Sequence, residues 1–181
     1  AVTRAMEGRH ILGFNYRMNE LQGALGLAQL RKLDTVCAEQ VKNKTKIKGF
    51  LSRVKEVGLR EIPDPAGDTA TFLAFNLPTE ELAAKFQKSL AAGGVDTVCF
   101  KANKWHYAPN WEHMMARSTA NPKQYPFTDP SYRGKVIYDR KDIPQAEDLL
   151  GRTLVMGISV KMTDERIAQI KAAVEKAAQE L

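Results

Sequence analysis

A capped and almost wholly apolar helix constrains the fold of this chain more than any other sequence feature. It lies within Ile11 to Asp34, where a polar turn leads into a helical pattern. Asn19 is a good N-cap, and Gln22 three positions later can reach back to the cap's own backbone N–H. Apolar residues then occupy nearly every side of the helix, so the pattern predicts a buried helix. These residues are Leu21, Ala24, Leu25, Leu27, Ala28, Leu30 and Leu33.

Two glycines lie inside this apolar helix, at positions 23 and 26. Each costs about 1 kcal/mol relative to alanine in a helix interior. Because the two are spaced to share a face, they indicate that another backbone comes close there. On periodicity alone, the simplest interpretation is a core helix with small residues at a helix crossing.

The residues just before the cap add a second interpretation. Asn15 and Arg17 lie where unpaired backbone N–H groups and the helix dipole favour an anion. Asparagine offers a neutral donor, and arginine a planar fork that can hold phosphate oxygens with two hydrogen bonds. The alternative is an ordinary N-cap turn fixed by its own side chains.

Two segments resemble a known family. Residues 13–34 resemble the signature with which the DegT/StrS-type sugar aminotransferases enter their C-terminal domain, and residues 144–167 resemble that family's closing section. The resemblance covers the chain from about residue 10 to its end and is loosest in the middle. The first segment reads Gly-Phe-Asn-Tyr-Arg-Met-Asn-Glu-Leu-Gln-Gly-Ala-Leu-Gly-Leu-Ala-Gln-Leu-Arg-Lys-Leu-Asp.

This resemblance implies the cofactor pyridoxal phosphate (PLP), whose ring acts as an electron sink beside a Schiff-base lysine. In the family that lysine belongs to the large N-terminal domain. The resemblance therefore implies that this chain holds no catalytic residue and is inactive alone. Asn15 and Arg17 would reach the PLP phosphate or the sugar site of a dimer partner, with Tyr16 near the substrate.

The implied reaction moves an amino group, with glutamate as donor, to a keto sugar. The sugar would be nucleotide-linked or a keto-deoxyoctulosonate, in the synthesis of lipopolysaccharide or another surface polysaccharide. The implied assembly is a cytoplasmic homodimer.

A second candidate site lies in the aromatic segment 105–113. Aromatic rings beside a histidine are typical of carbohydrate and nucleotide pockets. His106-Tyr107-Ala108-Pro109 resembles the family's His-Tyr-x-Pro element near the sugar, which makes His106 and Tyr107 substrate-binding candidates. Asn110-Trp111 follow where the family usually has Leu-His, which points to an unusual sugar. The alternative is that these aromatic residues pin a long loop to the core.

The expected fold is α/β or α+β, with a small, mostly antiparallel sheet of about three strands covered by helices. A long interdomain helix would enter it. Residues 1–14 are expected to be an arm left from the large PLP-binding domain, and residues 15–181 the C-terminal small domain. The expected elements are a helix from Asn19 with a kink near Asp34-Thr35, continuing until Gly58 ends it; strands at 69–77, 95–100 and 153–160; helices after Thr79 and Thr163; a short helix at 146–150; and an irregular stretch at 101–144.

The net charge of +6 is concentrated in residues 31–60, which hold nine Lys or Arg against three acids. This segment allows an alternative function, a non-catalytic basic module for nucleic acid or an anionic surface. Lysines at 42, 44, 46 and 48 step by two, which scatters them around a helix, and no aromatic residues are interleaved for base stacking. We favour a solvated helix whose positive charge is balanced by an acidic partner domain. Binding of nucleic acid is therefore not expected.

Other classes have little support in the sequence. Cys37 and Cys99 lack the spacing of a zinc or redox pair and are expected to be reduced. The three histidines lack the paired spacing of metal ligands, so the sequence does not predict a metal site. No apolar run has the length of a membrane span, and the first residues do not have the layout of a signal peptide.

Overall fold

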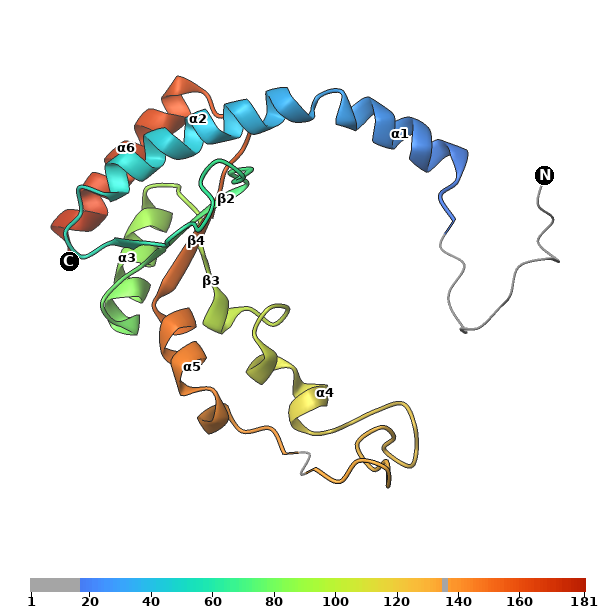
Figure 1. The fold of residues 1–181 in the computed structure, drawn as a ribbon. Helices are drawn as coiled ribbons and strands as arrows, with labels where there is room; N and C mark the ends of the chain where they lie inside the picture. The colour runs from blue at the N-terminus through green and yellow to red at the C-terminus, as the bar shows by residue number, and fades with distance from the viewer. Residues whose placement is uncertain (1–16, 135–136) are drawn as a thin grey trace. The chain divides into compact units, whose positions relative to one another are not determined.

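A computed structural model describes residues 17–134 and 137–181, and the chain divides into two compact units between Thr35 and Val36 (Figure 1). The arm expected over residues 1–14 lies outside the described residues, as do Asn15 and Tyr16.

The first unit contains helix α1, Glu20–Leu30, with the predicted cap. Asn19 Oδ1 accepts a 2.8 Å hydrogen bond from the Gln22 backbone N–H, and Gln22 Oε1 accepts a 3.0 Å bond from the Asn19 N–H. The capping box is therefore confirmed. It satisfies two donors that a helix start otherwise leaves without a partner.

The predicted burial of α1 is wrong for this chain, because none of its residues is buried. Leu21 is 79% exposed and Leu25 is 60% exposed. Around Gly26 no atom lies within 4 Å of the position a Cβ would take, so the close backbone approach expected there is also not found. Among the described residues, the first unit holds only α1 and the first residues of α2. Within them it therefore has no further element that could cover α1.

Helix α2, Leu33–Leu51, begins after a two-residue turn at Arg31 and Lys32, so the break comes slightly earlier than the expected kink. The helix also ends earlier than expected. Successive turns follow Leu51, and the predicted C-cap, Gly58, instead opens a short strand. The inner face of α2 is buried as expected, with Ile47 and Leu51 fully inaccessible.

The second unit is built on an antiparallel sheet with strand order β1-β2-β4-β3. Its strands are β1 (Gly58–Leu59), β2 (Phe72–Asn76), β3 (Val98–Cys99) and β4 (Thr153–Gly157). The predicted antiparallel sheet is confirmed, with four strands instead of three. The additional strand is β1, where Gly58 pairs with Asn76 and Leu59 with Phe75.

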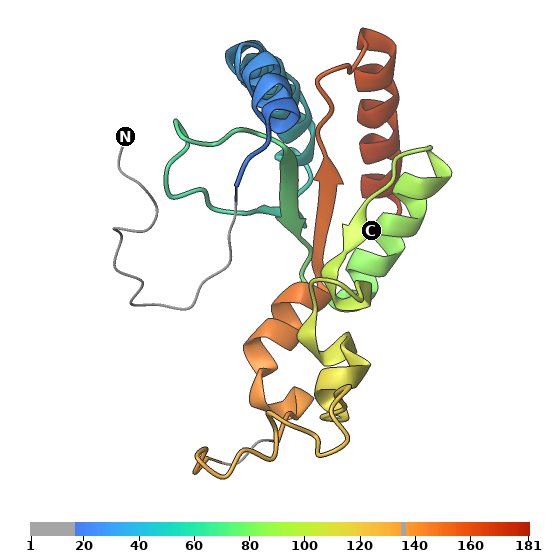
Figure 2. The same cartoon turned by 90° about the vertical axis from the view of Figure 1, so that its right-hand side faces the viewer.

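Two capped helices cover one face of this sheet. They are α3, Glu80–Ala92, and α6, Asp164–Gln179, which lie side by side (Figures 1 and 2). Both predicted caps are confirmed: Thr79 Oγ1 accepts from the Leu82 N–H and Thr163 Oγ1 from the Arg166 N–H, each at 3.2 Å.

The core lies between this sheet face and helices α2, α3 and α6. Alternate residues of the strands point into it, as their period of two predicts. The largest core side chains include Phe75 and Phe86, whose rings meet edge to face at 6.1 Å between centroids. Such a pair adds about 1 kcal/mol to the burial of its area.

Residues 100–151 form an extension at one end of the sheet, between the end of β3 and the start of β4 (Figure 2). The stretch expected to be irregular contains short helical turns at Phe100–Ala102, Ala108–Asn110 and Arg140–Asp142, and helix α4, Glu112–Met115. Helix α5, Pro144–Gly151, returns the chain to β4 and confirms the predicted short helix.

Candidate functional site

Of the three residues predicted at the mouth of α1, only Arg17 is described, and it is exposed. It precedes the capping residue by two positions. Arg17 thus precedes a helix N-terminus, where the helix dipole favours an anion.

The aromatic segment 105–113 is organised by Asn103. Its side-chain oxygen accepts the backbone N–H of Trp105 at 2.7 Å and that of His106 at 2.9 Å. His106 is exposed, with its ring 5.7 Å from that of Phe100, and Trp105 is 82% exposed. Tyr107 is only 1% exposed. The segment therefore buries Tyr107, half-buries Trp111 and presents Trp105 and His106 to solvent, so pinning to the core does not explain these last two.

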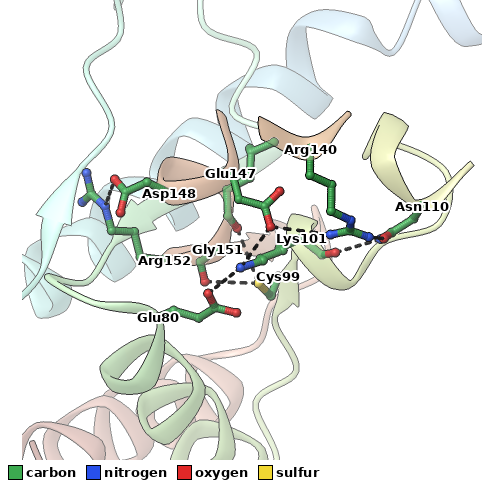
Figure 3. A network of polar contacts seen from close by, with 10 residues as sticks. Glu80, Cys99, Lys101, Asn110, Arg140, Glu147, Asp148, Gly151 and Arg152 are labelled. Carbon is green, nitrogen blue, oxygen red and sulfur yellow. Dashed lines mark hydrogen bonds and ion pairs between the residues drawn. The ribbon is translucent and has the colours of Figure 1, made fainter. Parts of the chain in front are cut away.

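A network of charged side chains joins α3, the turn after β3 and α5 (Figure 3). Lys101 Nζ lies 2.6 Å from Glu80 Oε2 and 3.3 Å from Glu147 Oε1. The Glu80 hydrogen bond, with support from Glu147, raises the pKa of Lys101 above its ordinary value, although partial burial opposes this. Lys101 is therefore a cation at neutral pH.

Arg140 connects the same network to the aromatic segment. Its Nη2 donates to Asn110 Oδ1 at 3.0 Å and to the Pro109 carbonyl at 3.3 Å. Its Nη1 lies 3.5 Å from Glu147 Oε1, and its Cζ lies 5.7 Å from the centre of the Tyr107 ring. One guanidinium thus contacts the turn Ala108–Asn110, helix α5 and the ring of Tyr107. Figure 3 shows its contacts with Asn110 and Glu147.

The amide of Asn110 is committed to the protein. Its Nδ2 donates to the Lys101 carbonyl at 2.8 Å and to the Asn103 carbonyl at 3.2 Å, while its oxygen accepts from Arg140. Both ends of the amide are therefore used in holding the turn. Asn110 shapes this region and has no free N–H for a ligand.

A pocket of about 430 Å³ lies against this network. Such a volume is within the usual range of small-molecule sites. Its polar groups are of both charges, with apolar surface beside them, which suits a ligand rich in hydroxyl groups. The lining includes Lys101, Lys104, Pro109, Asn110, Glu112, Met115 and Arg140.

An apolar pocket of about 180 Å³ shares Pro109 and Met115 with the first pocket. Its lining also includes the apolar side chains of Trp111, Met114 and Ile143. The segment 105–113 therefore separates a polar pocket from an apolar one.

Two buried polar atoms beside Arg140 have no hydrogen-bond partner in the described part of the chain. They are the Tyr107 hydroxyl and Glu147 Oε2. A buried polar group without a partner costs about 1–3 kcal/mol. The region around Arg140 can therefore still accept and donate hydrogen bonds.

Two lysines of the described residues, Lys44 and Lys101, do not fit the Schiff-base role in a PLP site. A Schiff-base lysine must become neutral to attack a carbonyl. Lys101 is held as a cation by two carboxylates, and Lys44 is buried in an ion pair with Asp68. We therefore assign neither lysine to the cofactor and derive no chemical step through it.

Three of the nine basic residues in the segment 31–60 form ion pairs with acids of the chain. Lys44 pairs with Asp68, Lys42 lies 3.2 Å from Glu39, and Lys46 lies 3.2 Å from Asp164. Three of the four lysines that step by two thus have acidic partners in their own unit. This pattern is typical of a helix with one face packed on the core and the other in solvent. It weakens the case for a nucleic-acid surface.

Two other kinds of feature are absent from residues 17–134 and 137–181. No cluster of three His, Cys, Asp or Glu side chains has the arrangement of a metal site. The helices in this range are either too short or too polar to cross a bilayer.

Sequence reasoning found the segment containing His106 and Tyr107 but missed the charged residues around it. Lys101, Arg140 and Glu147 belong to no motif and are spread over 47 positions of the chain. The only local signal was Asn110, which stands where the resembling family usually has another residue.

Comparison with known proteins gives a match to the model of the DegT/DnrJ/EryC1/StrS aminotransferase family over residues 2–129, more than half of the chain. Solved structures also match. The aminotransferase TlmJ from Streptoalloteichus hindustanus is 19% identical with a TM-score of 0.62, and the match covers 98% of this chain and 41% of TlmJ.

Two further matches are as distant in sequence. Helicobacter pylori PseC, an aminotransferase involved in the biosynthesis of pseudoaminic acid, is 17% identical over 100% of this chain and 43% of PseC, with a TM-score of 0.63. Spr1654 from Streptococcus pneumoniae, solved in a PLP form, is 12% identical over 90% of this chain and 36% of that protein, with a TM-score of 0.59. The chain spans about two fifths of the length of these structures, and at such identities the likeness concerns the fold.

Proposed function

The chain belongs to the DegT/DnrJ/EryC1/StrS aminotransferase family, and from this premise we propose that it is the C-terminal small domain of a PLP-dependent sugar aminotransferase. The enzyme transfers the amino group of glutamate to the carbonyl carbon of a keto sugar, and 2-oxoglutarate is released. The PLP-binding lysine is supplied by a large domain that precedes this one, which agrees with the ion-paired state of Lys44 and Lys101.

Helix α1 is the observation that carries this proposal. This capped helix of 11 residues has no buried residue. Its leucines are exposed, and the contact of their apolar surface with water is unfavourable in free energy. An exposed apolar surface of this kind marks an interaction site. We therefore assign α1 to the contact with the large domain and with a second copy of the protein in a homodimer.

The turn that precedes α1 then contributes to the partner subunit's site. Arg17 stands two residues before the cap, where its guanidinium and the helix N-terminus together favour a phosphate or another anion. Asn15 and Tyr16 join it in this proposal on the strength of the family signature alone. Either the PLP phosphate or the sugar nucleotide would be the anion.

The keto sugar is placed against the 430 Å³ pocket of the extension. Its walls offer charged hydrogen-bonding groups such as Lys104 and Glu112, beside the apolar surface of Pro109 and Met115. His106 lies exposed near the same turn, whereas Tyr107 supports the wall from within. A nucleotide-linked sugar and a keto-deoxyoctulosonate are both candidates.

The first experiment measures amino transfer by the full-length protein with glutamate as donor and each candidate sugar as acceptor. Arg17→Met is expected to lower the rate by about tenfold or more, since a charged hydrogen bond contributes about 1.5–3 kcal/mol. Arg31→Met, at the other end of α1, is the control and should leave the rate unchanged. Equal effects of the two variants would refute the role of Arg17.

Subunit mixing tests whether Arg17 acts across a dimer. A subunit carrying Arg17→Met is mixed with a subunit whose Schiff-base lysine is replaced. If Arg17 completes the partner's site, the mixed dimer regains one intact site and part of the activity. If Arg17 acts within its own subunit, mixing restores no activity.

The role of α1 is tested by self-association. Leu25→Glu places a charge on the exposed face of α1 and is expected to weaken the dimer in sedimentation experiments. Val41→Glu, at a residue of α2 that is 45% exposed, is the control. A steep, salt-dependent affinity for DNA would instead favour the basic-module alternative.

A further inference from the structure

We propose that Arg140 is a positioning residue for the acceptor pocket, holding the turn Ala108–Asn110 against helix α5. The identity of the ligand rests on the proposed function, whereas the contacts of Arg140 do not depend on it. Arg140 lines the 430 Å³ pocket and contacts two other lining residues, Pro109 and Asn110. No other side chain in the described ranges is recorded with contacts to both the turn and α5.

The contacts come from three directions. On one side, Nη2 donates to Asn110 Oδ1 at 3.0 Å and to the Pro109 carbonyl at 3.3 Å. On the other, Nη1 lies 3.5 Å from Glu147 Oε1 on α5. The guanidinium plane also lies over the buried ring of Tyr107, at 5.7 Å from Cζ to the ring centre.

This geometry needs arginine. The guanidinium has five N–H donors in a fixed fork, and the recorded contacts use three of them. Two donors therefore remain on a side chain that lines the pocket. Lysine keeps the charge but cannot hold two acceptors and a carboxylate in one plane.

Glu147 and Asn110 make the arrangement cooperative. Glu147 Oε1 is shared between Arg140 and Lys101, and the Asn110 amide bonds back to the Lys101 carbonyl. Loss of Arg140 therefore leaves the Asn110 side-chain oxygen and the Pro109 carbonyl without this donor, and Glu147 with one cation fewer. The pocket wall would loosen while the sheet and its core remain in place.

The test compares Arg140→Met and Arg140→Lys with Arg152→Lys in the full-length protein. Arg152 is a matched control because it also makes one ion pair and one carbonyl hydrogen bond near α5, to Asp148 at 2.9 Å and to Leu77 at 3.3 Å (Figure 3). Arg152 is not part of the pocket lining.

The first readout is amide hydrogen exchange, which requires no activity. The N–H groups of Asn110 and Trp111 close the turn with 2.9 Å bonds to Tyr107 and Ala108. We expect these two amides to exchange about tenfold faster in Arg140→Met, less so in Arg140→Lys, and unchanged in Arg152→Lys. Unchanged exchange in Arg140→Met overturns the inference.

The second readout separates the two half-reactions. Arg140→Met is expected to raise KM for the keto sugar about tenfold or more, while the half-reaction with glutamate alone proceeds at the wild-type rate. Arg140→Lys should recover part of the loss. A general loss of structure would slow both half-reactions equally, and that result overturns the positioning role. If the wild-type protein transfers no amino group at all, the proposed function fails, and the exchange readout alone decides whether Arg140 holds the turn.

Discussion

Replacing Asp68 by asparagine is expected to destabilise the second unit by about 3 kcal/mol at pH 7. The Lys44 side chain is only 7% exposed, and its ammonium group donates to the Asp68 carboxylate. Removing one partner of a buried ion pair costs about 3–5 kcal/mol, because the other charge stays buried without compensation. The lower end applies here, since the Asp68 side chain is 21% exposed and water can replace part of the loss.

The measurement is urea and thermal unfolding of the wild type and the variant. For a chain of this size, about 3 kcal/mol corresponds to a fall in Tm of roughly 6–12 °C. Glu39→Gln is the matched control, because it removes the acid of a neighbouring pair whose side chains are 59% and 43% exposed. Exposed pairs of this kind contribute about 0–1 kcal/mol.

The pH dependence follows from the Asp68 carboxylate. The hydrogen bond from Lys44, followed by that from the Ala70 N–H, lowers the pKa of Asp68 below its ordinary value. A group with a lowered folded-state pKa stabilises the fold above its unfolded pKa, about 3.9, and this contribution is lost as the pH falls through the folded pKa. The difference between wild type and Asp68→Asn should therefore be constant from pH 5 to 8 and shrink below about pH 4.

Two results would refute this reasoning. One is a loss in Asp68→Asn no larger than in Glu39→Gln. The other is a difference that does not shrink as the pH falls below about 4. Combining Asp68→Asn with Lys44→Met should recover most of the stability, because the double variant leaves no buried charge.

Three further changes have clear expected outcomes. Tyr107→Phe should be neutral or stabilising by up to about 1 kcal/mol in urea unfolding, because the buried hydroxyl has no partner among the described residues; a larger loss would mean that it has one. Gly93→Ala should cost about 1–3 kcal/mol, since its Cβ would lie 2.6 Å from that of Ala173, and an unchanged Tm would contradict this α3–α6 contact. Gly26→Ala, into open space, should raise the helicity of the isolated chain by circular dichroism and stabilise α1 by up to about 1 kcal/mol; a fall in helicity would show that the site is crowded.

Local signals predicted the helices well. Asn19, Thr79 and Thr163 each cap a helix through a residue three positions later, so cap and target are visible together in the sequence. Strand β1 was missed for the opposite reason. Gly58 and Leu59 are a strand only because Asn76 and Phe75 lie beside them, and two residues carry no periodicity of their own.

The candidate site likewise has a part that the sequence predicted and a part that it did not. The aromatic segment is contiguous, so its composition drew attention to His106 and Tyr107. Arg140 lies 27 positions and Glu147 34 positions beyond the end of this segment. Arg140 meets Tyr107, and Glu147 meets Arg140, only after the chain has folded. Isolated charged residues are usually solvated, so nothing in the sequence distinguished these two from their neighbours.

Helix α1 shows what hydrophobic periodicity can and cannot predict. The pattern correctly identified an apolar, capped helix, but burial was assigned on the assumption that the covering surface belongs to the same chain. Leu21 and Leu25 are as apolar as core leucines and are nevertheless exposed. The pattern records how much of a helix surface avoids water, and it carries no information on which polypeptide covers that surface. Under the proposed function, a preceding domain or a second subunit supplies the covering surface, which reconciles the pattern with the exposure. The same proposal explains Gly26, around which no atom lies within 4 Å of a Cβ position, since another backbone would approach it only in the assembled protein.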